Sequence, residues 1–96
     1  MKIDTDREAA YKALLAIERE GSYSNLELSK LLNGDEILNK GFIREIVYGV
    51  IENKIYIDYI LDKFIKKGAH KTKLQALIIL RMGVYQILFM NSVPNY

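Results

Sequence analysis

Apolar residues recur along most of this chain at the three- and four-residue spacing of an amphipathic helix. The first periodic segment opens with a capping box at residues 5–8 and ends at Gly21, which predicts a left-handed stop. A second capping box at residues 24–27 opens a shorter helix that runs through Leu32. The apolar stripes of these two helices are Ala10, Ala13, Leu14 and Ile17, then Leu28, Leu31 and Leu32.

Two further helices are predicted in the middle of the chain. Helical spacing returns at residues 42–51 and again at 57–65, with a break at Asn53-Lys54 between them. The second of these helices ends in Lys66-Lys67-Gly68, where lysines suit the negative end of the helix dipole. Residues 35–41 fit either a further helical turn or a loop. No sustained alternation of apolar and polar residues predicts a strand.

The last predicted helix covers about residues 72–90 and is apolar on nearly every side. A membrane span needs about 20 largely uncharged apolar residues. Here Gln75, Arg81 and Gln86 interrupt the stretch, and an arginine at mid-membrane is costly. A helix that is hydrophobic all round is otherwise the central helix of a bundle. We therefore expect an all-α fold of about five helices, with residues 72–90 central and buried.

Composition limits the chemistry that this chain can carry. Its 96 residues fit one domain, and the absence of cysteine with a single histidine, His70, makes a transition-metal site improbable on composition. The polar, acidic start at residues 1–6 does not resemble a signal peptide, so we expect a cytoplasmic protein. Because no nucleophile stands with an oriented base, we expect no catalytic residue in this chain.

The clearest charge feature is a group of basic residues at the junction between the last two predicted helices. Positive charges that neutralise phosphates release counterions, so this group is a candidate RNA surface. On composition alone, helix capping and solubility are the favoured explanation of the same residues, and a formal net charge of only +2 does not by itself indicate nucleic acid. The group comprises Lys63, Lys66, Lys67, His70, Lys71 and Lys73, and a smaller candidate set is Arg7 with Lys12.

Arg81 and Gln86 are expected to be structural hydrogen-bonding residues. An arginine within the most apolar helix must be paired or emerge at a surface. The seven tyrosines include Tyr48, Tyr56, Tyr59 and Tyr85. Tyrosine can stack on unpaired RNA bases, but for most of these residues we expect a place at the rim of the core.

Three stretches together resemble NusB-like domains. They are Arg7-Glu8-Ala9-Ala10; Glu45 to Ile51 (EIVYGVI) with Ile57 to Leu61 (IDYIL); and Leu80 to Met90 (LRMGVYQILFM) followed by Val93-Pro94. Tyr48-Gly49 and the run from Leu80 to Gln86 are more similar to the RsmB/Sun branch, whose members methylate small-subunit ribosomal RNA at cytosine C5, than to free-standing antitermination factors. The similarity covers essentially the whole chain.

The resemblance implies an RNA-binding domain, residues 1–96, at the N-terminus of a longer methyltransferase. Ribosomal RNA and the protein's own catalytic domain would be its partners, and S-adenosylmethionine would bind in that later domain. The arginine-rich opening of the family is reduced here to Lys2 and Arg7, and Lys54 is the positive charge nearest to the family's arginine at the end of the third helix.

The resemblance also implies a further helix after Pro94, so the chain is expected to be C-terminally truncated and to self-associate through an uncovered apolar face. Two alternative functions remain open at this point. One is a protein-interaction module, and the other is a stand-alone NusB-type antitermination factor.

Overall fold

A computed structural model describes residues 5–21, 24–32 and 38–90 of the chain. These residues form helices and no strand, which confirms the predicted all-α class. The elements are α1 (Thr5–Glu20), α2 (Ser24–Leu32), α3 (Lys40–Glu52), α4 (Lys54–Phe64), the 3-10 turn η1 (Ala69–Lys71), α5 (Leu74–Tyr85) and the π-helical turn η2 (Gln86–Met90).

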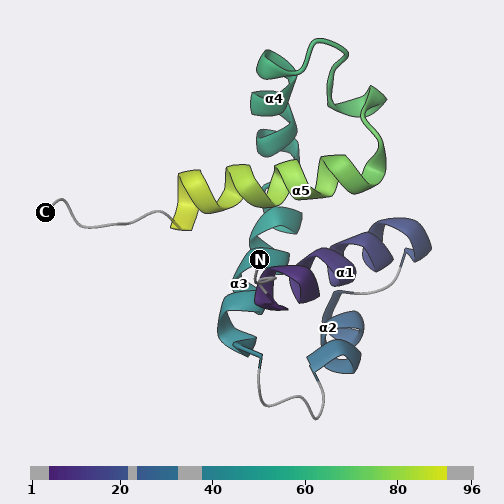
Figure 1. The fold of residues 1–96 in the computed structure, drawn as a ribbon, viewed down its shortest axis with the longest axis vertical. Helices are drawn as coiled ribbons and strands as arrows, with labels where there is room; N and C mark the ends of the chain where they lie inside the picture. The colour runs from purple at the N-terminus through teal and green to yellow at the C-terminus, as the bar shows by residue number, and fades with distance from the viewer. Residues whose placement is uncertain (1–4, 22–23, 33–37, 91–96) are drawn as a thin grey trace, which may run out of the picture.

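The helices are arranged around α5, which crosses the middle of the molecule (Figure 1). Helices α3 and α4 follow one another along the long axis, and α5 packs against both of them and against α1. Helix α2 packs against α1 and α3. The predicted central position of the last helix is therefore confirmed.

Small residues on α1 let the neighbouring helices approach closely. Ala9, Ala10 and Ala13 are all buried, and Ala10 has no exposed surface. Against this thin face packs the apolar stripe of α3, in which Ile43 and Ile46 are completely buried. Small side chains on α1 thus face large side chains on α3, which lets the two helices pack closely.

Polar residues fix the helix ends where the sequence predicted breaks. Gly21 has a φ of 67°, the left-handed conformation expected at the end of α1, and its N–H donates to Ile17 O at 2.9 Å. The side chain of Asn39 accepts a hydrogen bond from Phe42 N at 3.1 Å and so caps α3. Asn53 ends the same helix, because both its backbone N–H and its side-chain amide donate to Gly49 O.

The two capping boxes and residues 35–41 are only partly covered by the described residues. Helix α1 starts at Thr5 itself, so the cap of its first turn lies outside them, and the side chains of the box at 24–27 do as well. Within residues 35–41, helical structure begins at Lys40, after the cap residue.

Two expectations about the last helix need correction. It begins at Leu74 rather than Thr72, because η1 and the extended Thr72 and Lys73 occupy the preceding positions. It is also buried on one side only. Among the described residues, α1, α3 and α4 cover its inner face, and nothing covers the outer face. The exposed side chains are Ile79 and Leu80 of α5 and Ile87, Leu88 and Phe89 of η2.

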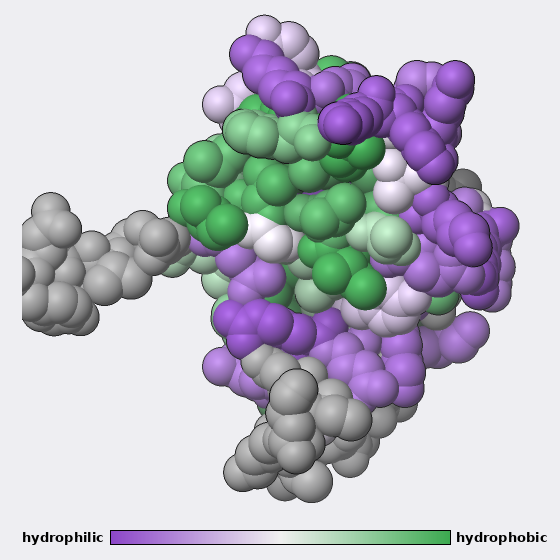
Figure 2. Space-filling view, turned by 45° about the horizontal axis from the view of Figure 1, so that its top comes forward, coloured by the Kyte–Doolittle hydropathy of each residue, from purple (hydrophilic) through white to green (hydrophobic). Residues whose placement is uncertain are grey.

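Figure 2 shows a broad hydrophobic surface on one face of the molecule. Exposed apolar residues of α4, including Ile55 and Phe64, add to the hydrophobic area of the molecule. Within the described residues, no helix combines the length and the apolar character that crossing a bilayer requires.

Candidate nucleic-acid interface

The basic residues between α4 and α5 are presented by a tightly hydrogen-bonded turn. Gly68 has a φ of 86°, a conformation that favours glycine. The carboxylate of Asp62 accepts a hydrogen bond from Ala69 N at 2.7 Å, and the Thr72 hydroxyl donates to Gly68 O at 3.1 Å. Because Ala69 is buried against the core, the turn is anchored and its flanking side chains point outward.

The basic residues that the sequence singled out at this junction lie on the last turn of α4, on the turn through η1 and at the start of α5, and we call them the lysine cluster. All six side chains are exposed, and none of them forms an ion pair with a carboxylate among the described residues. Lys71 and Lys73 of the cluster directly precede α5, whose first turn has no side-chain cap and carries the positive end of the helix dipole. Its members are Lys63, Lys66, Lys67, His70, Lys71 and Lys73.

The charge of this chain is distributed very unevenly along its length. The sequence from Lys63 to the end contains five lysines, one arginine and no Asp or Glu, a formal charge of +6. The first 62 residues contain eight basic and twelve acidic residues, a formal charge of −4. The low overall charge therefore conceals a strongly basic C-terminal part.

The smaller candidate set on α1 lies elsewhere. Arg7 donates from Nε to Gln86 Oε1 at 2.7 Å, and its guanidinium lies 5.1 Å from the centre of the Phe42 ring. Lys12 is exposed and pairs with Glu8 at 3.8 Å. Since Gln86 follows the far end of α5, Arg7 is separated from Lys73 by about 20 Å of helix. The two candidate sets do not form one continuous surface.

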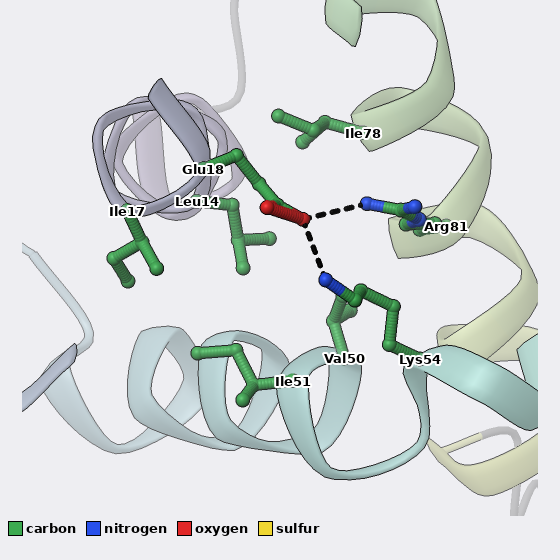
Figure 3. Close-up of a pocket in the computed structure, with 8 residues that line it drawn as sticks. All are labelled: Leu14, Ile17, Glu18, Val50, Ile51, Lys54, Ile78 and Arg81. Carbon is green, nitrogen blue, oxygen red and sulfur yellow. Dashed lines mark hydrogen bonds and ion pairs between the residues drawn. The ribbon is translucent and has the colours of Figure 1, made fainter. Parts of the chain in front are cut away.

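Arg81 is the centre of an ion-pair cluster that joins three helices (Figure 3). It donates to both carboxylate oxygens of Asp58, at 2.9 and 2.8 Å, and to Glu18 at 3.0 Å. Lys54 donates to the same Glu18 oxygen, also at 3.0 Å. The Arg81 side chain is only 8% exposed, so these contacts compensate the loss of its hydration.

The charged groups in this cluster shift one another's pKa values. Burial alone would raise the pKa of Glu18, but the hydrogen bond and charge of Lys54, together with those of Arg81, outweigh it and lower that pKa. Burial would lower the pKa of Arg81, and the two carboxylates reverse this effect and raise it. Both groups are therefore held in their charged forms.

A small cavity of about 80 Å³ lies beside this cluster (Figure 3). Its walls are mostly aliphatic side chains of α1, α3 and α5, and Lys54 and Arg81 point toward Glu18 at its edge. Lys54 is bonded to Glu18 and is therefore part of the ion-pair cluster. Its predicted contact with RNA stays a prediction.

Gln86 and Tyr85 tie the end of α5 to its neighbours. Gln86 accepts from Arg7 and donates from Nε2 to Met82 O at 3.0 Å. The hydroxyl of Tyr85 donates to Glu45 Oε2 at 2.7 Å. Burial, the hydrogen bond to Glu45 and nearby negative charge raise the pKa of Tyr85 to about 12.

The tyrosines divide into two groups. Tyr85 is buried and Tyr48 is half-buried, as expected at the rim of a core. Tyr56 and Tyr59 are 52% and 58% exposed and lie on the outer face of α4. The sequence does contain a signal for this, because the spacing from Tyr56 to Tyr59 to Lys63 puts all three on one helix face. Among the described residues, no three His, Asp or Glu side chains are grouped so that they could hold a metal ion.

Several curated proteins are similar to this chain over nearly its whole length. A protein of Bacillus subtilis named probable ribosomal RNA small subunit methyltransferase B is 36% identical over 99% of the chain, which corresponds to 22% of that relative. A protein of the same name from Synechocystis is 24% identical over 92% of the chain and 20% of the relative. The transcription antitermination protein NusB of Bacillus licheniformis is 33% identical over 98% of the chain and 72% of the relative.

The chain thus spans about a fifth of the methyltransferase relatives and about three quarters of the antitermination protein. No solved structure is significantly similar to it. The model of the NusB family matches residues 4–96, and the chain therefore belongs to the NusB family.

Proposed function

We propose that this chain is an RNA-binding domain that helps a ribosomal RNA cytosine-C5 methyltransferase hold its substrate. The observation that carries the proposal is the lysine cluster, in which exposed basic side chains gather without carboxylate partners among the described residues. Such a surface neutralises backbone phosphates and gains free energy from the counterions that it releases. The uncapped first turn of α5 adds its dipole to the same surface.

The methyltransferase part of the proposal is supported by the similarity to the two methyltransferase relatives. A domain that occupies a fifth of such a protein would position the RNA while a further domain carries out the reaction. S-adenosylmethionine supplies the methyl group in that chemistry. The described residues contain no strand followed by a glycine-rich turn that could hold a nucleotide cofactor, so we assign none of them to it and place no chemical step on this chain.

The experiment is a measurement of RNA affinity at several salt concentrations, by fluorescence anisotropy with a labelled fragment of small-subunit ribosomal RNA. We expect the double variant Lys66→Glu plus Lys71→Glu to bind at least about tenfold more weakly and to show a shallower dependence on salt, because two phosphate contacts are lost. Lys30→Glu is the matched control for each of the single variants Lys66→Glu and Lys71→Glu, since it makes the same change of charge at an exposed lysine on α2, outside the cluster.

Two outcomes would contradict the RNA-binding proposal. Absent or salt-insensitive binding would remove its basis. An equal loss in the Lys30 control would show that binding depends on total charge and not on the lysine cluster.

An antitermination factor is the second candidate, favoured by the 33% identity to a protein of that name over most of that protein's length. The open reading frame that encodes the chain distinguishes the two. Several hundred further codons with paired cysteines and a nucleotide-binding fold would support the methyltransferase. Without them, the antitermination role or a protein-interaction role would be favoured.

A further inference from the structure

An open groove lies at the elbow where α3 turns into α4. Its volume is about 590 Å³, and it is lined by the end of α3 and the outer face of α4. Tyr56 and Tyr59 supply aromatic walls, while Glu52, Asn53 and Lys54 supply polar groups. Neither tyrosine ring is used by the core, since each residue keeps more than half of its surface exposed.

Each of the two tyrosine rings has one further contact with a residue outside the groove lining. Lys63 places its ammonium 4.6 Å from the centre of the Tyr59 ring, a cation–π contact one helical turn along α4. Tyr56 meets Phe89 edge to face, with 6.3 Å between the ring centres. Contacts of this kind restrict ring motion, so less conformational entropy would be lost when a ligand stacks on the rings.

We propose that this groove binds an unpaired RNA base, which stacks on the face of Tyr59 opposite Lys63 while the lysine cluster holds the adjoining phosphates. The inference rests on the proposed RNA-binding function and specifies its ligand as single-stranded RNA. Every base has a π face that an exposed aromatic ring can stack on. Lys63 contacts Tyr59 and is also a member of the lysine cluster. One RNA strand can therefore run continuously from the groove to the cluster.

The carboxylate of Glu52 gives the groove a hydrogen-bond acceptor for a base. The amino groups of cytosine, adenine or guanine can donate to it. Paired bases cannot enter, because in a duplex their faces are covered by stacking and the grooves of A-form RNA do not present them.

The test compares an unpaired oligoribonucleotide, carrying one 2-aminopurine, with the same strand annealed to its complement. We expect the chain to bind the unpaired strand more tightly and to quench 2-aminopurine emission by stacking. Tyr59→Leu keeps the apolar bulk but loses the π face, and should weaken binding about tenfold to a hundredfold and abolish the quenching. Tyr59→Phe should retain both properties, and Tyr56→Leu gives a second, independent variant.

Failure of this inference is distinguishable from failure of the proposed function. If Tyr59→Leu binds and quenches as the unmodified chain does, or if duplex and single strand bind equally, the groove is not a base site and a protein segment becomes its candidate occupant. Either result leaves the effect of Lys66→Glu plus Lys71→Glu to decide whether the lysine cluster binds RNA. Because Tyr59 is exposed, its replacement is not expected to disturb the fold, which circular dichroism would check.

Discussion

The ring of Tyr85 lies directly against the backbone of Gly49, in space that any larger residue would occupy. A Cβ atom built on Gly49 would overlap the end of the ring. The ring has little freedom to move aside, because it is buried, its hydroxyl is bonded to Glu45 and its face is stacked on Phe89 with 5.1 Å between centres. This contact fixes how closely α5 approaches α3.

We therefore predict that Gly49→Ala lowers the free energy of unfolding by about 1–3 kcal/mol, the usual cost of overpacking a core. In a Tyr85→Ala background the same substitution should be neutral or should stabilise by up to about 1 kcal/mol, because alanine is the better helix former. Urea unfolding of the four proteins in this cycle measures the coupling. Equal effects of Gly49→Ala in the two backgrounds would contradict the assigned contact.

The ion pair between Arg81 and Asp58 leads to a second prediction. Asp58→Asn removes one of the two carboxylates bound to the buried guanidinium and leaves Glu18 as the other, which should reduce the free energy of unfolding by about 2 kcal/mol. Arg81→Met should cost less, because the carboxylates of Asp58 and Glu18 are 27% exposed and can regain hydration. Chemical denaturation would measure both changes. A larger loss for Arg81→Met than for Asp58→Asn would count against the assignment.

The positions of the helices follow from local sequence features, whereas the side-chain contacts between helices do not. Helical spacing and the glycine and asparagine positions predicted each helix, including the end of α1 at Gly21 and the break at Asn53. The partners of Arg81 lie 23 and 63 positions away, and only the packing of α1, α4 and α5 selects them from many carboxylates. The lysine cluster could be predicted because its members are local to one turn.

The same limit explains what sequence reasoning missed. Lys54 was assigned to RNA only because it is the positive charge nearest to the family's arginine at the end of the third helix, and the sequence did not indicate that Glu18 reaches it from α1 at a separation of 36 positions. The apolar character of the last helix predicted that it is buried. The amino-acid composition does not show how many other helices pack against it. Tyr56 and Tyr59 could have been recognised from their spacing with Lys63, since that pattern is local.

Glu18 gives a prediction about pH. Its folded-state pKa lies below the ordinary value of 4.5, so the unfolded chain binds the proton more readily than the folded chain does. The stability that Glu18 contributes is therefore complete above about pH 5 and is lost as the pH falls below 4.5 toward the folded pKa. We expect the difference in unfolding free energy between the unmodified chain and Glu18→Gln to shrink on acidification through this range.

Urea unfolding at a series of pH values would measure that difference. Glu20→Gln is the matched control, because Glu20 is an exposed residue at the end of the same helix and forms no ion pair among the described residues. If both variants approach the unmodified chain equally as the pH falls, the ion-pair cluster does not account for the pH dependence.

The outward face of α5 leads to the last prediction, which is self-association of this chain. Along that face small and large residues alternate. In chain order they are Ala76, Leu80, Gly83 and Ile87. If two copies pack antiparallel about a twofold axis between Leu80 and Gly83, Ala76 of each faces Ile87 of the other and Leu80 faces Gly83. The face is thus complementary to itself, as a twofold interface requires.

Light scattering should then show a mass that rises from monomer to dimer with concentration, and Leu80→Lys should restore the monomer because it buries a charge in the interface. Leu26→Lys is the matched control, since Leu26 is 60% exposed and lies on α2, away from this face. A monomeric mass at every concentration, or an equal effect of the two lysine substitutions, would contradict the interface. A dimer that forms through α5 would leave the lysine cluster of each copy at an end of the shared helix pair, because the cluster flanks the start of α5 and is not part of its outer face.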